Sequence, residues 1–391
     1  MSAPRIRLAV AALCLLWLAL GLANVARGLG AVGPDYWRWA FEHHSYSDLL
    51  TLYSPRYLGG AHPVPYLQDR IEYPPVLGLI LWLPSFLPGG PPAYLAASAL
   101  FLVGCLALAL WSLSRLPDAR PWWLAATPAL AYYAFLNWDL LPVALIAASL
   151  LALDRGQAAR SGALAALATA AKLFPAALVP ATLGALGALG AGGRPALRRW
   201  ALAAAGVLLA LNLPLALLAF EGWSWFFRFN AARGAENSVW HALGGPSGRW
   251  LDLAWLGPVA IAGLAALLGA WRCARRGGDG ARAARLGTAL VLVVWIALNK
   301  VWSPQYALYG FLAGALVAAP GWLFAALTAV SVADYHLEFE VRARDWAPWF
   351  VEALVKPSEL VRTGLWLVLA AWIGAALWRE ARRPLSSPSA T

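Results

Sequence analysis

Acidic and aromatic side chains are concentrated in one stretch of the chain, the polar interval from Gly33 to Pro75. Asp35 follows the first apolar run, where its carboxylate could take a proton from a hydroxyl group that attacks a sugar. The same Pro-Asp pair, placed before WRWAFEHH, is an equally good helix N-cap. Trp37 could stack on a sugar, although an interfacial aromatic belt is its commoner role. An acidic, aromatic loop at the end of a membrane helix indicates sugar chemistry at a membrane surface.

Two further polar breaks offer groups that could contact a substrate. Glu72 and Tyr73 precede a double proline, which fixes an extended backbone and would hold both side chains at the membrane face. Asn137 and Asp139 interrupt two apolar runs. An ionisable residue at that depth is a candidate for function, while a simple turn between helices explains it equally well.

Basic side chains that could bind phosphate occur later in the chain. Lys172 lies in a run that is otherwise apolar, without an acidic residue nearby in sequence. Burying it would cost several kcal/mol unless a partner such as a phosphate is present, and snorkelling to the interface is the alternative. The polar loop 221–250 contains arginines, whose planar forks suit phosphate. The break at 299–306 is typical of a helix that lines a cavity. These two segments contribute Arg233, Asn237, Ser238, His241, Lys300 and Gln305 as candidates.

The composition excludes a soluble globular domain. The chain has 391 residues, of which 61% are hydrophobic and 13% charged, about half the charged fraction of a typical soluble domain. Apolar runs recur almost to the C-terminus, which predicts an all-α polytopic membrane protein. The net charge of +11 does not indicate nucleic-acid binding, because the arginines form short clusters between apolar runs, where they set orientation. The three cysteines are scattered and predict neither a disulfide framework nor a metal site.

The apolar runs predict a bundle of about ten to thirteen transmembrane helices. The expected spans are 8–30, 93–113, 121–136, 140–153, 161–173, 175–190, 200–220, 251–271, 286–299, 305–319, 321–334 and 361–378. The segment 74–88 is apolar, but it is short and has prolines at both ends. We therefore interpret it as a re-entrant or incompletely spanning segment. The alternative is that one of the short pairs, such as 121–136 with 140–153, is miscounted.

The arginine clusters between the apolar runs are expected to face the cytoplasm. With that orientation, both termini lie in the cytoplasm as well. The acidic residues would then lie on the outer face, apart from Asp118, Asp154, Asp279 and Glu380. An extracytoplasmic active site would explain this one-sided gathering. We expect a single membrane domain over 1–378, with a catalytic loop at 31–75, a second large outer loop at 221–250, and a disordered cytoplasmic tail at 379–391.

The ordered series of motifs resembles the GT-C glycosyltransferases, most closely glycosyltransferase family 87 (DUF2029-type) of actinobacteria. The series covers most of 30–315 and departs from the family pattern at RGAENS. It consists of the Asp35 loop ending in Glu72-Tyr73-Pro74-Pro75, NWDLLPVALIAASLLALDRG, AAKLFPAALVP, RGAENSVWHAL and NKVWSPQYALYGFLAG.

This resemblance implies an inverting transfer of mannose, or a related sugar, from a polyprenyl-phosphate donor. The acceptor would be a lipid-linked molecule or a polysaccharide outside the plasma membrane. The resemblance makes Asp35 the general base. Lys172, Arg233, His241 and Lys300 become candidates for binding the donor phosphate, and the other polar candidates would contact the substrate. No cofactor or metal-ligand cluster is expected, and a carboxylate-bound divalent metal stays open.

A second hypothesis is a transporter or flippase for a lipid-linked sugar or a small anion. Lysines within the membrane and broken helices fit a transporter too. Such a protein should show pseudo-symmetric halves, whereas this chain shows no repeat and gathers its polar residues on one side. The sequence therefore favours the transferase.

Overall fold

The computed structural model describes residues 3–188, 190–344 and 347–382. Within these ranges every regular element is a helix, and loops and turns connect the helices without a strand. This confirms the predicted all-α polytopic class. Apolar segments rich in Leu and Ala satisfy every backbone hydrogen bond internally when they are helical, which a hydrocarbon environment demands. The proposed tail, apart from 379–382, lies outside the described residues.

Six helices in the described part are long and apolar enough to cross a membrane. They include α1 (Ala3–Ala26, continued by the 3₁₀ helix η1, Arg27–Ala31), α5 (Gly90–Ser114), α11 (Gly190–Leu218), α14 (Gly248–Arg275), α15 (Gly280–Leu298) and α19 (Lys356–Arg382). This set is smaller than the number of expected spans. Several apolar runs form shorter or broken helices instead.

The shorter helices fill the space between the long ones. Residues 121–136, expected to be one span, are broken by Pro128 into α6 (Trp122–Ala125) and α7 (Ala129–Tyr133). The others are α8 (Leu140–Asp154), α9 (Ala158–Ala171), η3 (Phe174–Ala177), α10 (Leu178–Gly187), η4 (Pro304–Tyr306) and α16 (Ala307–Val317). The helix α17 (Gly321–Ala343) has 23 residues but is not among the six candidate spans.

The segment 74–88, which has prolines at both ends, does not form a spanning helix. It folds into the eight-residue α4 (Pro75–Trp82) and the four-residue 3₁₀ helix η2 (Leu83–Phe86). At about 1.5–2 Å of rise per residue, this piece is well short of the roughly 30 Å hydrocarbon core. The short, re-entrant interpretation therefore fits its length.

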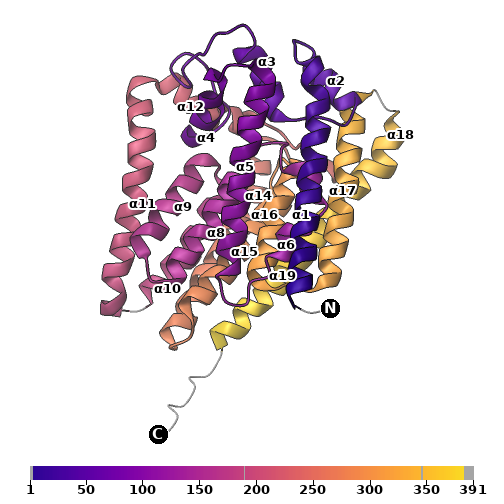
Figure 1. The fold of residues 1–391 in the computed structure, drawn as a ribbon. Coiled ribbons are helices and arrows are strands. Elements are labelled where there is room, and N and C mark those ends of the chain that lie inside the picture. The colour runs from indigo at the N-terminus through magenta and orange to yellow at the C-terminus, as the bar shows by residue number, and fades with distance from the viewer. Residues whose placement is uncertain (1–2, 189, 345–346, 383–391) are drawn as a thin grey trace.

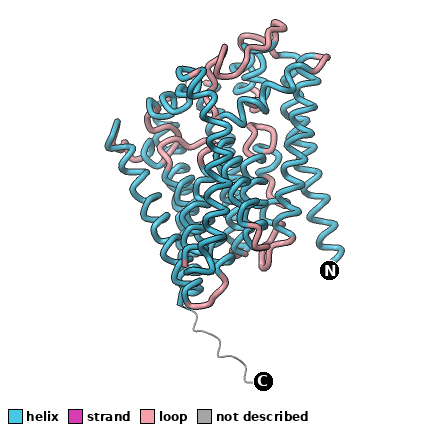
Figure 2. The backbone as a smooth tube through the Cα atoms, turned by 90° about the vertical axis from the view of Figure 1, so that its left-hand side faces the viewer, coloured by secondary structure: helices cyan, strands magenta, loops and turns pink. Residues whose placement is uncertain are grey.

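The polar segments gather at one end of the bundle. Figure 1 shows α2 (Tyr36–Glu42), α3 (Asp48–Tyr57), α4 and α12 (Phe220–Ala232) together at the upper end, and α1 begins and α19 ends at the lower end. Loops cap both ends of the bundle, with helices between them (Figure 2). The remaining small elements are α13 (Val239–Ala242), α18 (Pro348–Phe350) and the π-helix η5 (Val351–Val355).

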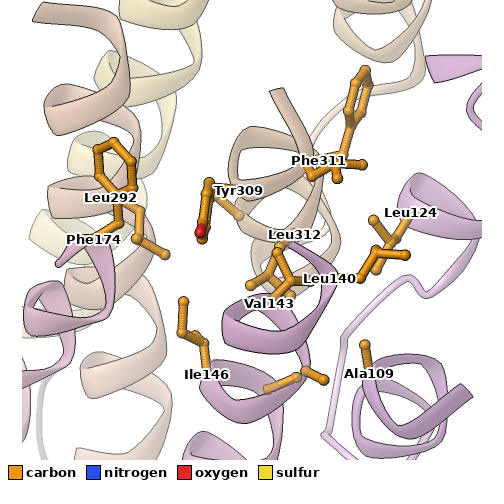
Figure 3. Packing of buried hydrophobic residues seen from close by; sticks show 14 of the residues in the cluster. Ala109, Leu124, Leu140, Val143, Ile146, Phe174, Leu292, Tyr309, Phe311 and Leu312 are labelled. Carbon is orange, nitrogen blue, oxygen red and sulfur yellow. The ribbon is translucent and has the colours of Figure 1, made fainter. Parts of the chain in front are cut away.

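Packing at the centre of the bundle fixes the middle helices against one another. Leu140, Val143 and Ile146 of α8 pack near Leu312 of α16 (Figure 3). Tyr309 lies in the same region of the core, and its hydroxyl donates to the buried Asp139 carboxylate at 2.9 Å. Burial of this kind contributes about 25 cal/mol per Å² of apolar surface, so α8 and α16 form a rigid support for the residues above them.

Arginines join the helix ends at the opposite end of the bundle. Arg282 lies 2.6 Å from Asp118, and Arg285 lies 2.6 Å from Asp154. Asp279 caps α15, and Arg282 also pairs with Glu380 of α19. The four acidic residues that the sequence separated from the others therefore lie together, among the arginine clusters.

Candidate active site

A cavity of about 740 Å³ lies at the end of the bundle where α2, α3, α4 and α12 gather. Its volume is within the usual range for small-molecule sites. The walls come from the segment between α2 and α3, the start of α4, the α7–α8 connection, η3, α12, the break between α15 and α16, and α17. The cavity thus joins segments that are far apart in sequence.

The Asp48 carboxylate is held in this cavity by three donors. Tyr46 donates to Oδ1 at 2.6 Å, while Asn137 and Tyr73 donate to Oδ2 at 2.5 and 3.2 Å. Ser47 caps α3 by accepting from Leu49 N, which fixes Asp48 in the first helical turn. Burial raises the pKa of the Asp48 carboxyl, and the donors together with Lys172 oppose this rise. Asp48 is therefore an oriented carboxylate of increased basicity.

Glu72 and Tyr73, two of the residues proposed from the sequence to contact a substrate, both line the cavity. Glu72 accepts from Arg56 at 3.2 Å, and Arg56 also bonds to Asp69 at 2.6 Å. Burial raises the pKa of Glu72, and Arg56 opposes the rise. Tyr66 donates its hydroxyl to the carbonyls that precede α4. These bonds hold the end of the long polar interval against the cavity.

Lys172 reaches the cavity at the point where α9 ends. Its backbone is extended, with φ −150° and ψ 155°, so the helix stops and Nζ bonds to Asp139 Oδ2 at 2.7 Å. Asp139 is fully buried behind the cavity and also accepts from Tyr309 at 2.9 Å. This lysine has no acidic residue nearby in the sequence, because its partner Asp139 lies 33 residues earlier and is adjacent only in space. Asp139 supports Lys172 and is not itself part of the cavity lining.

Tyr73 connects the acidic and basic parts of the cavity. Its hydroxyl bonds to Asp48, and its ring centroid lies 5.5 Å from Lys172 Nζ. Tyr306 approaches Lys172 from another side, at 5.8 Å. Ring faces attract a cation at these distances. The lysine therefore lies close to the Asp48 carboxylate without bonding to it.

Arg233 and Lys300 line the cavity opposite α3, each with an acidic partner. Arg233 binds Glu236 through two nitrogens, and this bond lowers the pKa of Glu236. Lys300 bonds to Asp252 at 2.9 Å. Glu236 also pairs its backbone with residues 300 and 302, so the two cations belong to one folded unit.

Residues of α17 complete the basic wall, and sequence reasoning missed them. Glu338, Phe339 and Arg342 line the cavity, and Arg342 bonds to Glu338 one turn away. The spacing of these two charges by four residues was the available signal. It was uninformative because an exposed helical ion pair has the same pattern.

The apolar part of the cavity is formed mainly by aromatic rings. Phe226, Phe227 and Phe229 of α12 line it, and Phe227 is 45% exposed. Trp255 of α14 and Trp295 of α15 contribute as well. An apolar wall beside four cations suits a ligand that is both hydrophobic and anionic.

The structure does not bring Asp35 or Trp37 into this cavity. Asp35 is exposed at the start of α2, where its side chain makes no capping hydrogen bond, and Trp37 is 44% exposed. Asn137 and Gln305 do line the cavity. Asp48 was one of several acids in the same interval, and its sequence neighbours did not reveal that Tyr73 and Asn137 converge on it.

Asn237, Ser238 and His241 lie behind the cavity wall and not in its lining. Arg362 binds Asn237 and the buried Asp334, which also accepts from Trp302 at 2.7 Å. Ser238 caps α13, and His241 bonds to Glu359 at 2.9 Å. This bond raises the pKa of His241. In the structure these three residues support the segment that presents Arg233 and Lys300.

The cavity is lined by four cations, Lys172, Arg233, Lys300 and Arg342, and by five carboxylates, Asp48, Glu72, Glu236, Asp252 and Glu338. The last four carboxylates each bond to an arginine or lysine, whereas Asp48 is held by neutral donors. A carboxylate can accept a proton from a hydroxyl, and the cations can stabilise charge that develops on a leaving group. Across the described ranges, no three His, Cys, Asp or Glu side chains converge as ligands for a metal ion.

Comparison with known protein families identifies a match to this chain. The model of glycosyltransferase family 87 matches residues 72–298, which is more than half of the chain. Its matched region includes Glu72, Asn137, Lys172 and Arg233, and stops just before Lys300. No curated protein and no solved structure matches the chain.

Proposed function

The chain belongs to glycosyltransferase family 87, and from that premise we propose that the cavity transfers a sugar from a polyprenyl-phosphate donor to a hydroxyl group. The family and the spanning helices make the protein a membrane glycosyltransferase. Mannose is the sugar we propose, on the basis of the family resemblance. The acceptor would be a lipid-linked molecule or a polysaccharide.

One observation carries this proposal: a single cavity holds the Asp48 carboxylate, several cations and an aromatic wall. A polyprenyl phosphate has an isoprenoid chain for the phenylalanines of α12 and a phosphate for the basic side chains. Lys172, Arg233 and Lys300 are the proposed phosphate ligands, and Arg342 joins them. Each already has an acidic partner, so the phosphate would share or replace an existing ion pair.

We assign the role of general base to Asp48 in place of Asp35. In the proposed step, the acceptor oxygen forms a bond to the anomeric carbon while the bond from that carbon to the phosphate oxygen breaks. The hydroxyl proton passes to Asp48, and the polyprenyl phosphate leaves as an anion held by the cations. Because the phosphate leaves already ionised, no strong general acid is needed. A single displacement of this kind inverts the anomeric centre.

The proposed location of the cavity is the extracytoplasmic face of the plasma membrane. The ion pairs of Arg282 and Arg285 lie at the end of the bundle away from the cavity. Positively charged loops prefer the cytoplasm, which supports this orientation.

A transfer assay with two matched substitutions tests the assignment. Membranes from a host that lacks the activity would contain wild type, Asp48→Asn or Asp35→Asn at equal protein levels. The assay supplies radiolabelled polyprenyl-phosphate mannose and a membrane lipid extract. Removing a general base commonly costs about 10²–10⁴-fold in rate. We expect that loss in Asp48→Asn and near wild-type transfer in Asp35→Asn.

The outcomes separate the competing assignments. Loss of product in Asp35→Asn alone would return the base to Asp35, and equal transfer by both variants would remove both from the mechanism. If wild type transfers neither mannose nor arabinose from the corresponding donors, the transferase proposal fails. Uptake or flipping of the labelled lipid would then favour a transporter.

A further inference from the structure

A second cavity, of about 660 Å³, lies between α1 and α17. We call it the lateral groove, and it includes Trp17 and Leu20 of α1 and Val332 and His336 of α17. Both helices stand at the same side of the bundle in Figure 1. Leu20 is 49% exposed, so the groove is open along the surface that faces hydrocarbon in a spanning helix.

The two ends of the lateral groove differ in chemistry. One end is lined by Trp17, Leu20, Ala329 and Val332, which are all apolar. The other end contains Arg27, which lies ten residues after Trp17. Ten helical residues span about 15 Å. A ligand that fits both ends must be apolar over much of its length and polar or charged at one end.

Histidines surround the polar end together with Arg27. His44 Nδ1 lies 3.1 Å from His336 Nδ1, so only one of these two nitrogens can carry the shared proton. His44 Nε2 bonds to Glu340 at 2.9 Å, which offsets any positive charge on the pair. His43 Nδ1 lies 2.7 Å from the Trp39 carbonyl, which can only accept, so Nδ1 carries the proton in this contact. Nε2 of a neutral His43 is then an acceptor and does not bind an anion.

Arg27 is the permanent cation at this end. It donates to Asn24 Oδ1 at 3.1 Å. Since a guanidinium carries five N–H donors, Arg27 can keep this bond and still offer a two-pronged contact to a phosphate.

An aromatic wall separates the lateral groove from the reaction cavity. Phe41 stacks on Tyr46 at 4.5 Å, and Phe339 packs against Phe41 at 5.5 Å and Tyr335 at 4.3 Å. On α17, Tyr335 and His336 line the groove, whereas Phe339 lines the reaction cavity. The two sites therefore lie at a similar depth but on opposite sides of one wall.

We propose that the lateral groove binds an anionic phospholipid, with its phosphate at Arg27 and one acyl chain along Leu20 and Val332. A water-soluble phosphate would leave the apolar end exposed to hydrocarbon. A lipid without a phosphate would leave Arg27 without an anionic partner at this end, and a zwitterionic phospholipid would bring a second cation there along with its phosphate. This lipid is distinct from the sugar donor, and its binding does not depend on the proposed reaction.

Photo-crosslinking tests the site without measuring activity. The purified full-length protein is placed in phosphatidylcholine nanodiscs with a small amount of phosphatidylglycerol that carries a diazirine on one acyl chain. After illumination, mass spectrometry maps the labelled peptides. We expect label on the segments around Leu20 and Val332, displaced by unlabelled phosphatidylglycerol and not by added phosphatidylcholine.

Two variants and a control make the result decisive. Arg27→Gln should reduce this label about tenfold, the usual cost of a lost charged hydrogen bond, while Arg38→Gln, an exposed arginine of α2 outside the groove, should not. Ala329→Trp should remove the label by filling the apolar end, with unchanged thermal unfolding. Equal displacement by both lipids, or label that persists in Arg27→Gln and Ala329→Trp, would show ordinary surrounding lipid and overturn the proposal.

Discussion

At the scale of single residues, the site depends on partners that hold each charge in place. Asp48 has three donors, and Lys172 shares the buried Asp139 with Tyr309. A buried charge without a partner would cost several kcal/mol. Partners therefore decide both which groups can lie in the cavity and how basic they are.

The pH dependence of transfer follows from the environment of Asp48. Its pKa is raised by burial and lowered by its donors, and the base must be unprotonated to act. Activity should therefore fall as the pH drops through this raised pKa. Asn137→Ala removes a donor that favours the carboxylate, so the acid limb of kcat/KM should move to higher pH. The measurement is the pH profile of sugar transfer in both proteins.

A second amide in the same cavity provides the control for this shift. Asn230 bonds to the Phe226 carbonyl and not to Asp48. Asn230→Ala should leave the acid limb in its wild-type position, whatever its effect on the maximal rate. A limb unmoved by Asn137→Ala would mean that Asp48 does not set it.

The amino-acid sequence indicates which charged residues occupy unusual positions, but it does not indicate their partners in space. Lys172 and Lys300 stood out because charges interrupt apolar runs, and both line the cavity. Asp48 did not stand out, because several acids occupy the same interval and its donors lie in three separate segments. Asp35 was favoured by its position after the first helix, a pattern that does not report which way the following loop folds.

At the scale of helices, close packing decides which elements can meet. A Cβ atom on Gly184 of α10 would lie 2.2 Å from the Leu267 carbonyl oxygen of α14. Small residues allow such approaches between membrane helices. The apolar pattern predicted these helices, but broken segments such as α6 and α7 have the same composition as spans. Their breaks depend on Pro128 and on tertiary contacts.

Enlarging Gly184 should therefore loosen the pair α10 and α14. Overpacking commonly costs about 1–3 kcal/mol, so Gly184→Leu should lower the thermal unfolding temperature of the purified protein. Gly206→Leu on α11 is the matched control, because a Cβ there meets no atom within 4 Å. Equal unfolding temperatures for the two variants would contradict this description of the packing.

At the scale of the whole molecule, two sets of charged residues lie at opposite ends of the bundle. The cavity lies at one end, and the arginines that pair with Asp118 and Asp154 lie at the other. Runs of arginine between apolar segments were enough to predict this separation. The convergence of α3, α12 and α17 on one cavity was not predictable, since it depends on how short helices pack.

The orientation can be measured with single cysteines on a background where the buried Cys14, Cys105 and Cys273 are replaced. Ala61→Cys lies in an exposed loop between α3 and α4, and Gln157→Cys is exposed before α9. A membrane-impermeant maleimide should label Ala61→Cys in intact cells and Gln157→Cys only after permeabilisation. The reverse labelling pattern would place the cavity on the cytoplasmic face of the membrane and contradict the proposed orientation.

The position of the donor phosphate is the most decisive evidence on where sugar transfer takes place. The measurement is a cryo-electron microscopy map of the full-length protein with a non-hydrolysable phosphonate analogue of polyprenyl-phosphate mannose. We predict phosphonate density among Lys172, Arg233 and Lys300, the isoprenoid chain along the phenylalanines of α12, and the sugar beside Asp48. Phosphonate density among the arginines at the opposite end, or in the lateral groove alone, would contradict the account.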